Sequence, residues 1–180
     1  MIDIHEVQEQ LRRANLDGWL LYDFQGLNPI AKKLVGLQAG MLTRRWYFWI
    51  PKQGEPSVLC NRIEQFGFAL LNTRVRTFKS WQEMIESLKQ MLEGHETIAM
   101  EYSPLCSIPY VSRVDAGTVE AVESLGKKVT SSADLVQYFQ SRWSQQQFEM
   151  HLEASRLLMN ILFETFQSVG DTVRQGTHLT

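Results

Sequence analysis

Two His-Glu pairs are the first residues in this sequence that could do chemistry. His5-Glu6 and His95-Glu96 each match the start of the helical zinc-protease pattern, in which a second histidine four residues on shares the metal. A glutamate and an alanine stand at those two later positions. Neither pair therefore predicts a zinc site.

The remaining reactive side chains also fail to form a set. His151 lies between Glu149 and Glu153, but residues two apart on a helix point to different sides, so we expect a surface histidine beside a packed face. Cys60 and Cys106 lie in separate apolar contexts without metal or disulfide spacing, and we predict two buried free thiols. Serine elbows, dinucleotide loops and phosphate loops are absent from the sequence. We predict no catalytic residue and no metal ligand in this chain.

The aromatic run WYFW at 46–49 could form a stacking platform for bases or sugars. Consecutive residues of a strand point to opposite faces of the sheet, however, so four aromatics in a row cover both faces. We interpret the run as core.

The composition limits the classes of molecule that this protein can be expected to bind. The 180 residues are 44% hydrophobic and 21% charged with a formal net charge of −2, which is typical of a folded domain and lacks the basic excess of nucleic-acid-binding proteins. No apolar run reaches the roughly 18 residues that predict a membrane-spanning helix, and the N-terminus does not resemble a signal peptide. We expect a cytoplasmic protein with no nucleic-acid or membrane partner.

The hydrophobic periods predict the elements that must position any site. Strands are expected at 19–24, 44–50, 57–60, 74–78, 97–101 and 127–130, the second and third as a hairpin around a Pro/Gly turn. Helices are expected at 4–14, 31–36, 63–71, 81–92 and 111–125. This alternation predicts an α/β fold, a three-layer mixed sheet flanked by helices, with the strand at 19–24 central and the hairpin to one side.

A long C-terminal helix follows. Ser144 and Gln147 predict its capping box, after a shorter helix through 135–139. Its apolar side chains recur at steps of four and three and predict a self-association or domain-interface stripe: Phe148, Leu152, Met159, Leu162, Phe166 and Val169. We expect residues from about 144 onward to begin a second unit that is mostly missing.

The order of these parts resembles the N-terminal portion of the creatinase and Xaa-Pro aminopeptidase family of prolidase-like metallopeptidases. The resemblance rests on the segments DGWLLYDFQGLNPIAKKLVGL, RRWYFWIPKQGEPSVLCN, RIEQF, SWQEMIESLKQML, TIAMEY, SSADLVQYFQSRWSQQQFEMHLEASRL and VRQGTHLT. It implies a creatinase-like N-terminal α/β domain at 1–131, a linker helix at 132–143 and, at 144–180, the truncated start of the pita-bread catalytic domain.

The resemblance also implies where the chemistry lies. In the family two divalent metals (Mn, Co or Zn) are held by two aspartates, a histidine and two glutamates of the catalytic domain, and none of those ligands has a matching position here. The chain alone would be inert. Its expected partners are its own catalytic domain, a second subunit and, in the full-length protein, a peptide substrate.

The family's N-terminal domain helps form the dimer and lends residues to a neighbour's substrate channel. The segment from Gly36 to Arg45 resembles the loop that faces that channel, so Arg44 and Arg45 are its candidates. A guanidinium there could bind a carboxylate or carbonyl of a peptide, although a solvated arginine at a strand start is the simpler interpretation. Two alternatives stay open for the function, an N-terminal domain of a creatinase-like amidinohydrolase and a non-catalytic peptide- or protein-binding module.

Overall fold

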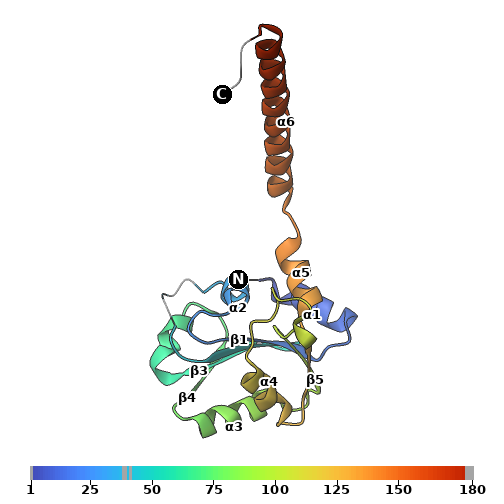
Figure 1. Ribbon diagram of the computed structural model, residues 1–180. Coiled ribbons are helices and arrows are strands. Elements are labelled where there is room, and N and C mark those ends of the chain that lie inside the picture. The colour runs from blue at the N-terminus through green and yellow to red at the C-terminus, as the bar shows by residue number, and fades with distance from the viewer. Residues whose placement is uncertain (1, 38–39, 41, 177–180) are drawn as a thin grey trace. The chain divides into compact units, whose positions relative to one another are not determined.

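The computed structural model describes residues 2–37, 40 and 42–176, and the chain divides into two compact units, residues 1–140 and 141–180 (Figure 1). Parts of two sequence-based predictions lie outside the described residues. They are positions 38, 39 and 41 of the proposed channel loop and the last four residues of the segment VRQGTHLT.

The first unit is built on one six-stranded mixed sheet. Its strands are β1 (Gly18–Asp23), β2 (Trp46–Pro51), β3 (Ser57–Asn61), β4 (Arg74–Phe78), β5 (Thr97–Met100) and β6 (Lys128–Ser131). Their order is β4-β3-β2-β1-β5-β6, and the β1–β2 and β2–β3 pairs are antiparallel while the other three are parallel. The predicted mixed sheet is confirmed, with β1 in its interior and the hairpin on one side.

Helices cover both faces of this sheet, which gives the three predicted layers (Figure 1). Apolar side chains of α1 (Ile4–Arg13), α2 (Pro29–Val35), the 3₁₀ helix η1 (Arg62–Phe68) and α5 (Ala133–Ser141) pack in the core on one face. Those of α3 (Trp81–Met91) and α4 (Ala116–Glu123) pack in the core on the other.

Successive side chains of β1 and β2 point to opposite faces of the sheet and are apolar on both, so helices must cover both faces. Trp46 and Phe48 belong to the core under α1 and α2, whereas Tyr47 and Trp49 belong to the core under α3 and α4. All four aromatics are at most 3% exposed. The interpretation of this run as core is confirmed, and it forms no stacking platform.

Two helices differ from their predicted form. The segment predicted as a helix at 63–71 is the 3₁₀ helix η1, which contains Gly67, a weak helix former, and is capped by the Asn61 side chain. The helix predicted at 111–125 begins only at Ala116. There the Asp115 carboxylate accepts the backbone N–H of Thr118 at 2.9 Å and fixes the start of α4.

One of the two thiol predictions is wrong. Cys60 lies in β3 and is buried, and burial raises its pKa to about 12. Cys106 is exposed, because it lies outside the sheet in the short 3₁₀ turn η2 (Pro104–Cys106), where its φ is +53°. An apolar sequence context did not distinguish a strand from a surface loop.

The second unit contains the long helix α6 (Gln145–Arg174). Its predicted capping box is confirmed, since Ser144 Oγ accepts the N–H of Gln147 at 3.2 Å and Gln147 Oε1 accepts that of Ser144 at 2.8 Å. Among residues 141–176 no other helix or strand begins. None of the described helices is long and apolar enough to cross a membrane.

Candidate functional site at the carboxyl edge of the sheet

The strand directions gather most strand ends at one edge of the sheet. β1, β5 and β6 run parallel, and because β2 is antiparallel to both β1 and β3, strands β3 and β4 also run with β1. Five strands therefore end, and β2 begins, at one edge, which we call the carboxyl edge. Ligands of open α/β sheets bind beyond the carboxyl ends of their strands, so a ligand site is expected at this edge.

Asp23 is the last residue of β1 and is only 2% exposed. Its Oδ1 accepts the backbone N–H of Asn28 at 2.7 Å, and its Oδ2 accepts the N–H of Gly26 at 3.0 Å and the indole N–H of Trp46 at 3.1 Å. The carboxylate thus ties the loop after β1 to the first residue of β2.

Glu101 follows β5 at the same edge and is fully buried. Its Oε1 accepts the indole N–H of Trp19 at 2.6 Å and the hydroxyl of Ser132 at 3.1 Å, while its Oε2 accepts the amide of Asn28 at 2.8 Å. Burial raises the pKa of this carboxyl to about 7, although the donors favour its charged form.

Asn28 joins the two carboxylates. Besides its bond to Glu101, its Nδ2 donates to the backbone oxygen of Tyr22 at 2.7 Å, and its Oδ1 accepts the N–H of Ala31 at 3.1 Å, which caps α2. We call this set the buried polar network: Trp19, Asp23, Asn28, Trp46, Glu101 and Ser132. Every carboxylate oxygen in it accepts a protein donor, so the network holds the edge together and has little capacity to act on a substrate.

A pocket of about 380 Å³ opens beside Asp23 and Trp46. Its wall is mixed, with the cation Lys32 and the apolar side chains of Leu37 and Leu42. The volume lies within the range of small-ligand sites. Because Asp23 is fully bonded within the protein, Lys32 supplies the charge that a ligand would meet there.

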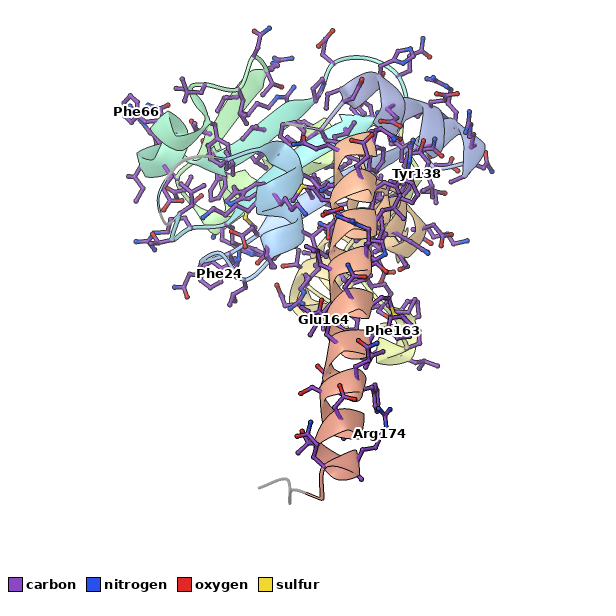
Figure 2. All side chains as sticks on the ribbon, turned by 90° about the horizontal axis from the view of Figure 1, so that it is seen from above. Phe24, Phe66, Tyr138, Phe163, Glu164 and Arg174 are labelled. Carbon is purple, nitrogen blue, oxygen red and sulfur yellow. The ribbon has the colours of Figure 1, made fainter. Side chains whose placement is uncertain are left out.

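Arg45, one of the two predicted channel residues, is exposed immediately before β2. Its guanidinium carbon lies 5.9 Å from the ring centroid of Phe24, a cation–π contact. The contact with Phe24, which follows β1 and is labelled in Figure 2, places an exposed cation at the carboxyl edge.

Arg44, the other predicted channel residue, is fixed through its backbone. Its N–H donates to both oxygens of Glu64 at 3.1 Å, and the same carboxylate accepts the N–H and hydroxyl of Thr43 at 2.7 and 2.8 Å. Glu64 therefore anchors the chain at the entry to β2. Of the two arginines, Arg45 is the one whose charged group is oriented by its neighbours.

The described residues form no candidate metal-binding site. No three His, Cys, Asp or Glu side chains gather among them to hold an ion. His95 packs against Trp49, with ring centroids 5.1 Å apart, and His151 packs against Trp143 at 4.5 Å. These two histidines serve as packing partners of tryptophans.

The predicted stripe residues all project from α6. Phe148, Leu152, Met159, Leu162, Phe166 and Val169 are between 37% and 67% exposed. Figure 2 shows Phe163 and Glu164 on different sides of the same helix, and Phe163, which is outside the stripe, is 63% exposed.

The residues of the buried polar network were not predicted from the sequence. In the sequence Asp23 follows an apolar run, Asn28 precedes Pro29, and Glu101 ends a predicted strand, yet none of the three was predicted as a site residue. Only their positions at or after the ends of predicted strands could have indicated them. A polar residue at the carboxyl end of an apolar strand lies where an α/β sheet places its polar groups.

The comparisons with known proteins fall into two kinds. No protein-family model matches the sequence, and no curated protein is significantly similar to it. Solved structures do match, and prolidase and Xaa-Pro dipeptidase chains are among them.

A proline dipeptidase from Streptococcus pneumoniae matches 79% of this chain and 100% of its own, with a TM-score of 0.63 and 11% identity. The creatinase/prolidase N-terminal domain of an X-Pro dipeptidase from Streptococcus pyogenes matches 74% of this chain and 95% of its own, with a TM-score of 0.58 and 12% identity. The prolidase from Pyrococcus horikoshii OT3 matches 81% of this chain with a TM-score of 0.56 and 17% identity, and the match spans only 37% of that enzyme. The fold is therefore that of the creatinase/prolidase N-terminal domain.

Proposed function

We propose that this chain is the N-terminal, non-catalytic part of an Xaa-Pro aminopeptidase- or dipeptidase-like metallopeptidase. Residues 1–131 would be the domain, residues 132–143 a linker helix, and the segment from 144 the start of a catalytic domain. The observation that supports this most is the fold match, which covers nearly the whole of a solved N-terminal domain but little more than a third of a prolidase.

The reaction proposed for the whole enzyme is hydrolysis of the peptide bond before a proline. Two divalent metals, Mn, Co or Zn, would activate the attacking water in the catalytic part. The described residues of this chain assemble no group that fits such ions, so we assign no step through a metal to them. Their role is to position other groups.

The positioning group we propose is Arg45. Its planar guanidinium is always charged and is suited to bidentate bonds with a carboxylate. Its guanidinium already lies over the Phe24 ring, so less side-chain entropy would be lost when it binds a peptide. In the dimer of the full enzyme, this edge would face the substrate channel of a second subunit.

An NMR titration of the isotopically labelled chain with the dipeptide Ala-Pro tests this role. We expect millimolar binding, with shift changes around Arg45, that is lost in Arg45→Ala and weakened for Ala-Pro amide, which lacks the carboxylate. Arg44→Ala is the matched control and should bind as the unmodified chain does. Equal binding by Arg45→Ala, or no binding by the unmodified chain, would exclude Arg45 as the peptide contact.

A further inference from the structure

We propose that the pocket beside Asp23 and Trp46 binds a small organic acid, a monocarboxylate with an apolar body of about ten non-hydrogen atoms. This proposal does not depend on the peptidase assignment. It rests on the size of the pocket, on the backbone conformation of its wall and on the charge that a ligand meets there.

The size of the pocket sets the size of the ligand. Its volume is about 380 Å³. A water molecule occupies about 30 Å³ in the liquid, so this space corresponds to about a dozen waters and can hold an organic molecule of about ten non-hydrogen atoms. Leu37, Leu42 and Trp46 supply apolar wall, and Leu37 and Trp46 belong to the core on that face of the sheet. An apolar ligand body placed against them would leave water, which favours binding.

The wall next to β1 has an unusual backbone conformation. Gln25 has a φ of +57° and Gly26 a φ of +75°, and both residues line the pocket. A left-handed conformation is uncommon for glutamine, and such conformations concentrate at ligand-binding and active sites. Asp23 maintains the turn by accepting the N–H of Gly26 at 3.0 Å and that of Asn28 at 2.7 Å. The wall is therefore formed before a ligand arrives.

The buried polar network ties this turn to the sheet. Asn28 donates from its Nδ2 to Glu101 at 2.8 Å and to the backbone oxygen of Tyr22 at 2.7 Å. The indole of Trp46, which lines the pocket, donates to Asp23 at 3.1 Å. Burying two carboxylates is a costly way to close the edge of a sheet. Their hydrogen bonds, however, hold the turn and the Trp46 ring in place around an open space.

The charge available to a ligand in this pocket is positive. Lys32 lines the pocket from α2, its side chain is exposed, and no carboxylate of the described residues forms an ion pair with it. Asp23 shares the wall, but it is only 2% exposed and its oxygens already accept three N–H groups. A carboxylate can accept hydrogen bonds from the Lys32 ammonium while the rest of the molecule lies against the apolar wall.

An NMR titration of the isotopically labelled chain with 3-phenylpropionate tests the proposal. We expect saturable binding with a dissociation constant in the low millimolar range, and nuclear Overhauser effects between the phenyl ring and the side chains of Leu37 and Trp46. The neutral analogue 3-phenylpropionamide should bind about three to five times more weakly, which is the contribution of an exposed charge pair. The cation 3-phenylpropylamine should bind more weakly still. If the amine binds as well as the acid, the pocket selects a cation through Asp23 and the proposal is wrong.

Two neighbouring lysines provide the variant and its control. Lys32→Met keeps an apolar stem of similar length and should lose the preference for the acid over the amide. Lys33 is also exposed on α2 but does not line the pocket, so Lys33→Met should bind as the unmodified chain does. The amide spectrum of each variant reports whether it is folded. An unmodified chain without saturable binding, a ligand without contacts to Leu37 and Trp46, or an undiminished acid preference in Lys32→Met would each overturn the proposal.

Discussion

Replacing Glu101 by glutamine should change how the stability of the protein depends on pH. Burial raises the pKa of this carboxyl from 4.5 to about 7. A group whose pKa is higher in the folded state holds its proton more tightly there than in the unfolded chain. Between about pH 4.5 and pH 7 the unfolded chain therefore loses this proton while the folded one keeps it, and folding stability falls as the pH rises.

The magnitude follows from the size of the shift. Each pKa unit corresponds to about 1.4 kcal/mol, so the rise to about 7 corresponds to roughly 3 kcal/mol of stability lost between pH 4.5 and 7.5. Glutamine cannot titrate, so Glu101→Gln should lack this fall. The variant should be less stable by a constant amount of about 1–3 kcal/mol at every pH. The reason is that the glutamine NH₂ group would replace a carboxylate oxygen that accepts a hydrogen bond from Trp19 or from Asn28, so two donors would face each other.

Ser132 explains how a protonated Glu101 can be accommodated. Trp19 and the Nδ2 of Asn28 can only donate, but a hydroxyl can also accept. The acid proton would then lie between Glu101 and Ser132, which are 3.1 Å apart. A single hydroxyl rotation therefore fits both protonation states.

The assay is urea unfolding from pH 5 to pH 8, with the free energies of Glu101→Gln and the unmodified protein compared at each pH. Groups common to both proteins, such as His95, cancel in this difference. Glu101→Met, which neither titrates nor donates, should show the same pH-dependent difference with a larger constant cost. A difference that stays constant within about 0.5 kcal/mol over this range would show that Glu101 is already ionised at pH 5, and would refute the reasoning.

The remaining predictions concern packing and one surface carboxylate. Leu21→Ala should cost about 2–5 kcal/mol in denaturant unfolding, because Leu21 is fully buried in β1, and a loss below about 1 kcal/mol would contradict its core role. Gly18→Ala should cost about 1–3 kcal/mol or more, because the added methyl carbon would overlap the Trp49 ring. The methyl carbon of Gly117→Ala in α4 would meet only one atom, at 3.3 Å, so this control variant should be tolerated. Equal thermal stability of the two variants would contradict this prediction. The Lys52 ammonium, 2.7 Å from the Asp17 carboxylate, holds the pKa of Asp17 far below its usual range, so this ion pair stabilises the protein above about pH 4 and its contribution is lost as the pH falls. Asp17→Asn should therefore cost about 1 kcal/mol of unfolding free energy at pH 7 and progressively less on acid titration. If the difference in unfolding free energy between this variant and the unmodified protein were the same at pH 2 as at pH 7, the prediction would be wrong.

Much of the fold could be predicted because its signal is local. The apolar run of β1, the aromatic hairpin and the apolar spacing of α6 each extend over several residues, so local sequence pattern alone was enough to predict these elements. The start of α4 and the form of η1 were missed, because they depend on single capping side chains and on a glycine. The position of Cys106 depended on where the chain leaves the sheet.

The candidate site was harder to predict, because its residues meet only after folding. Glu101 bonds to Trp19 and Asn28, which lie 82 and 73 positions away in the sequence. The order of the strands in the sheet brings these residues together, and a local sequence pattern does not predict that order. Arg45 was selected through the resemblance, while its contact with Phe24 depends on the β1–β2 pairing.

We expect the metals of the proposed peptidase to be bound outside this chain. Calorimetric titration of the purified chain with Mn²⁺ or Co²⁺ tests it most directly, because a catalytic metal pair requires a cluster of oxygen and imidazole ligands. The purified chain should show no stoichiometric site of submicromolar affinity and no cleavage of Xaa-Pro peptides in the same samples. A stoichiometric submicromolar site, accompanied by turnover that persists after contaminating peptidases are removed, would contradict it.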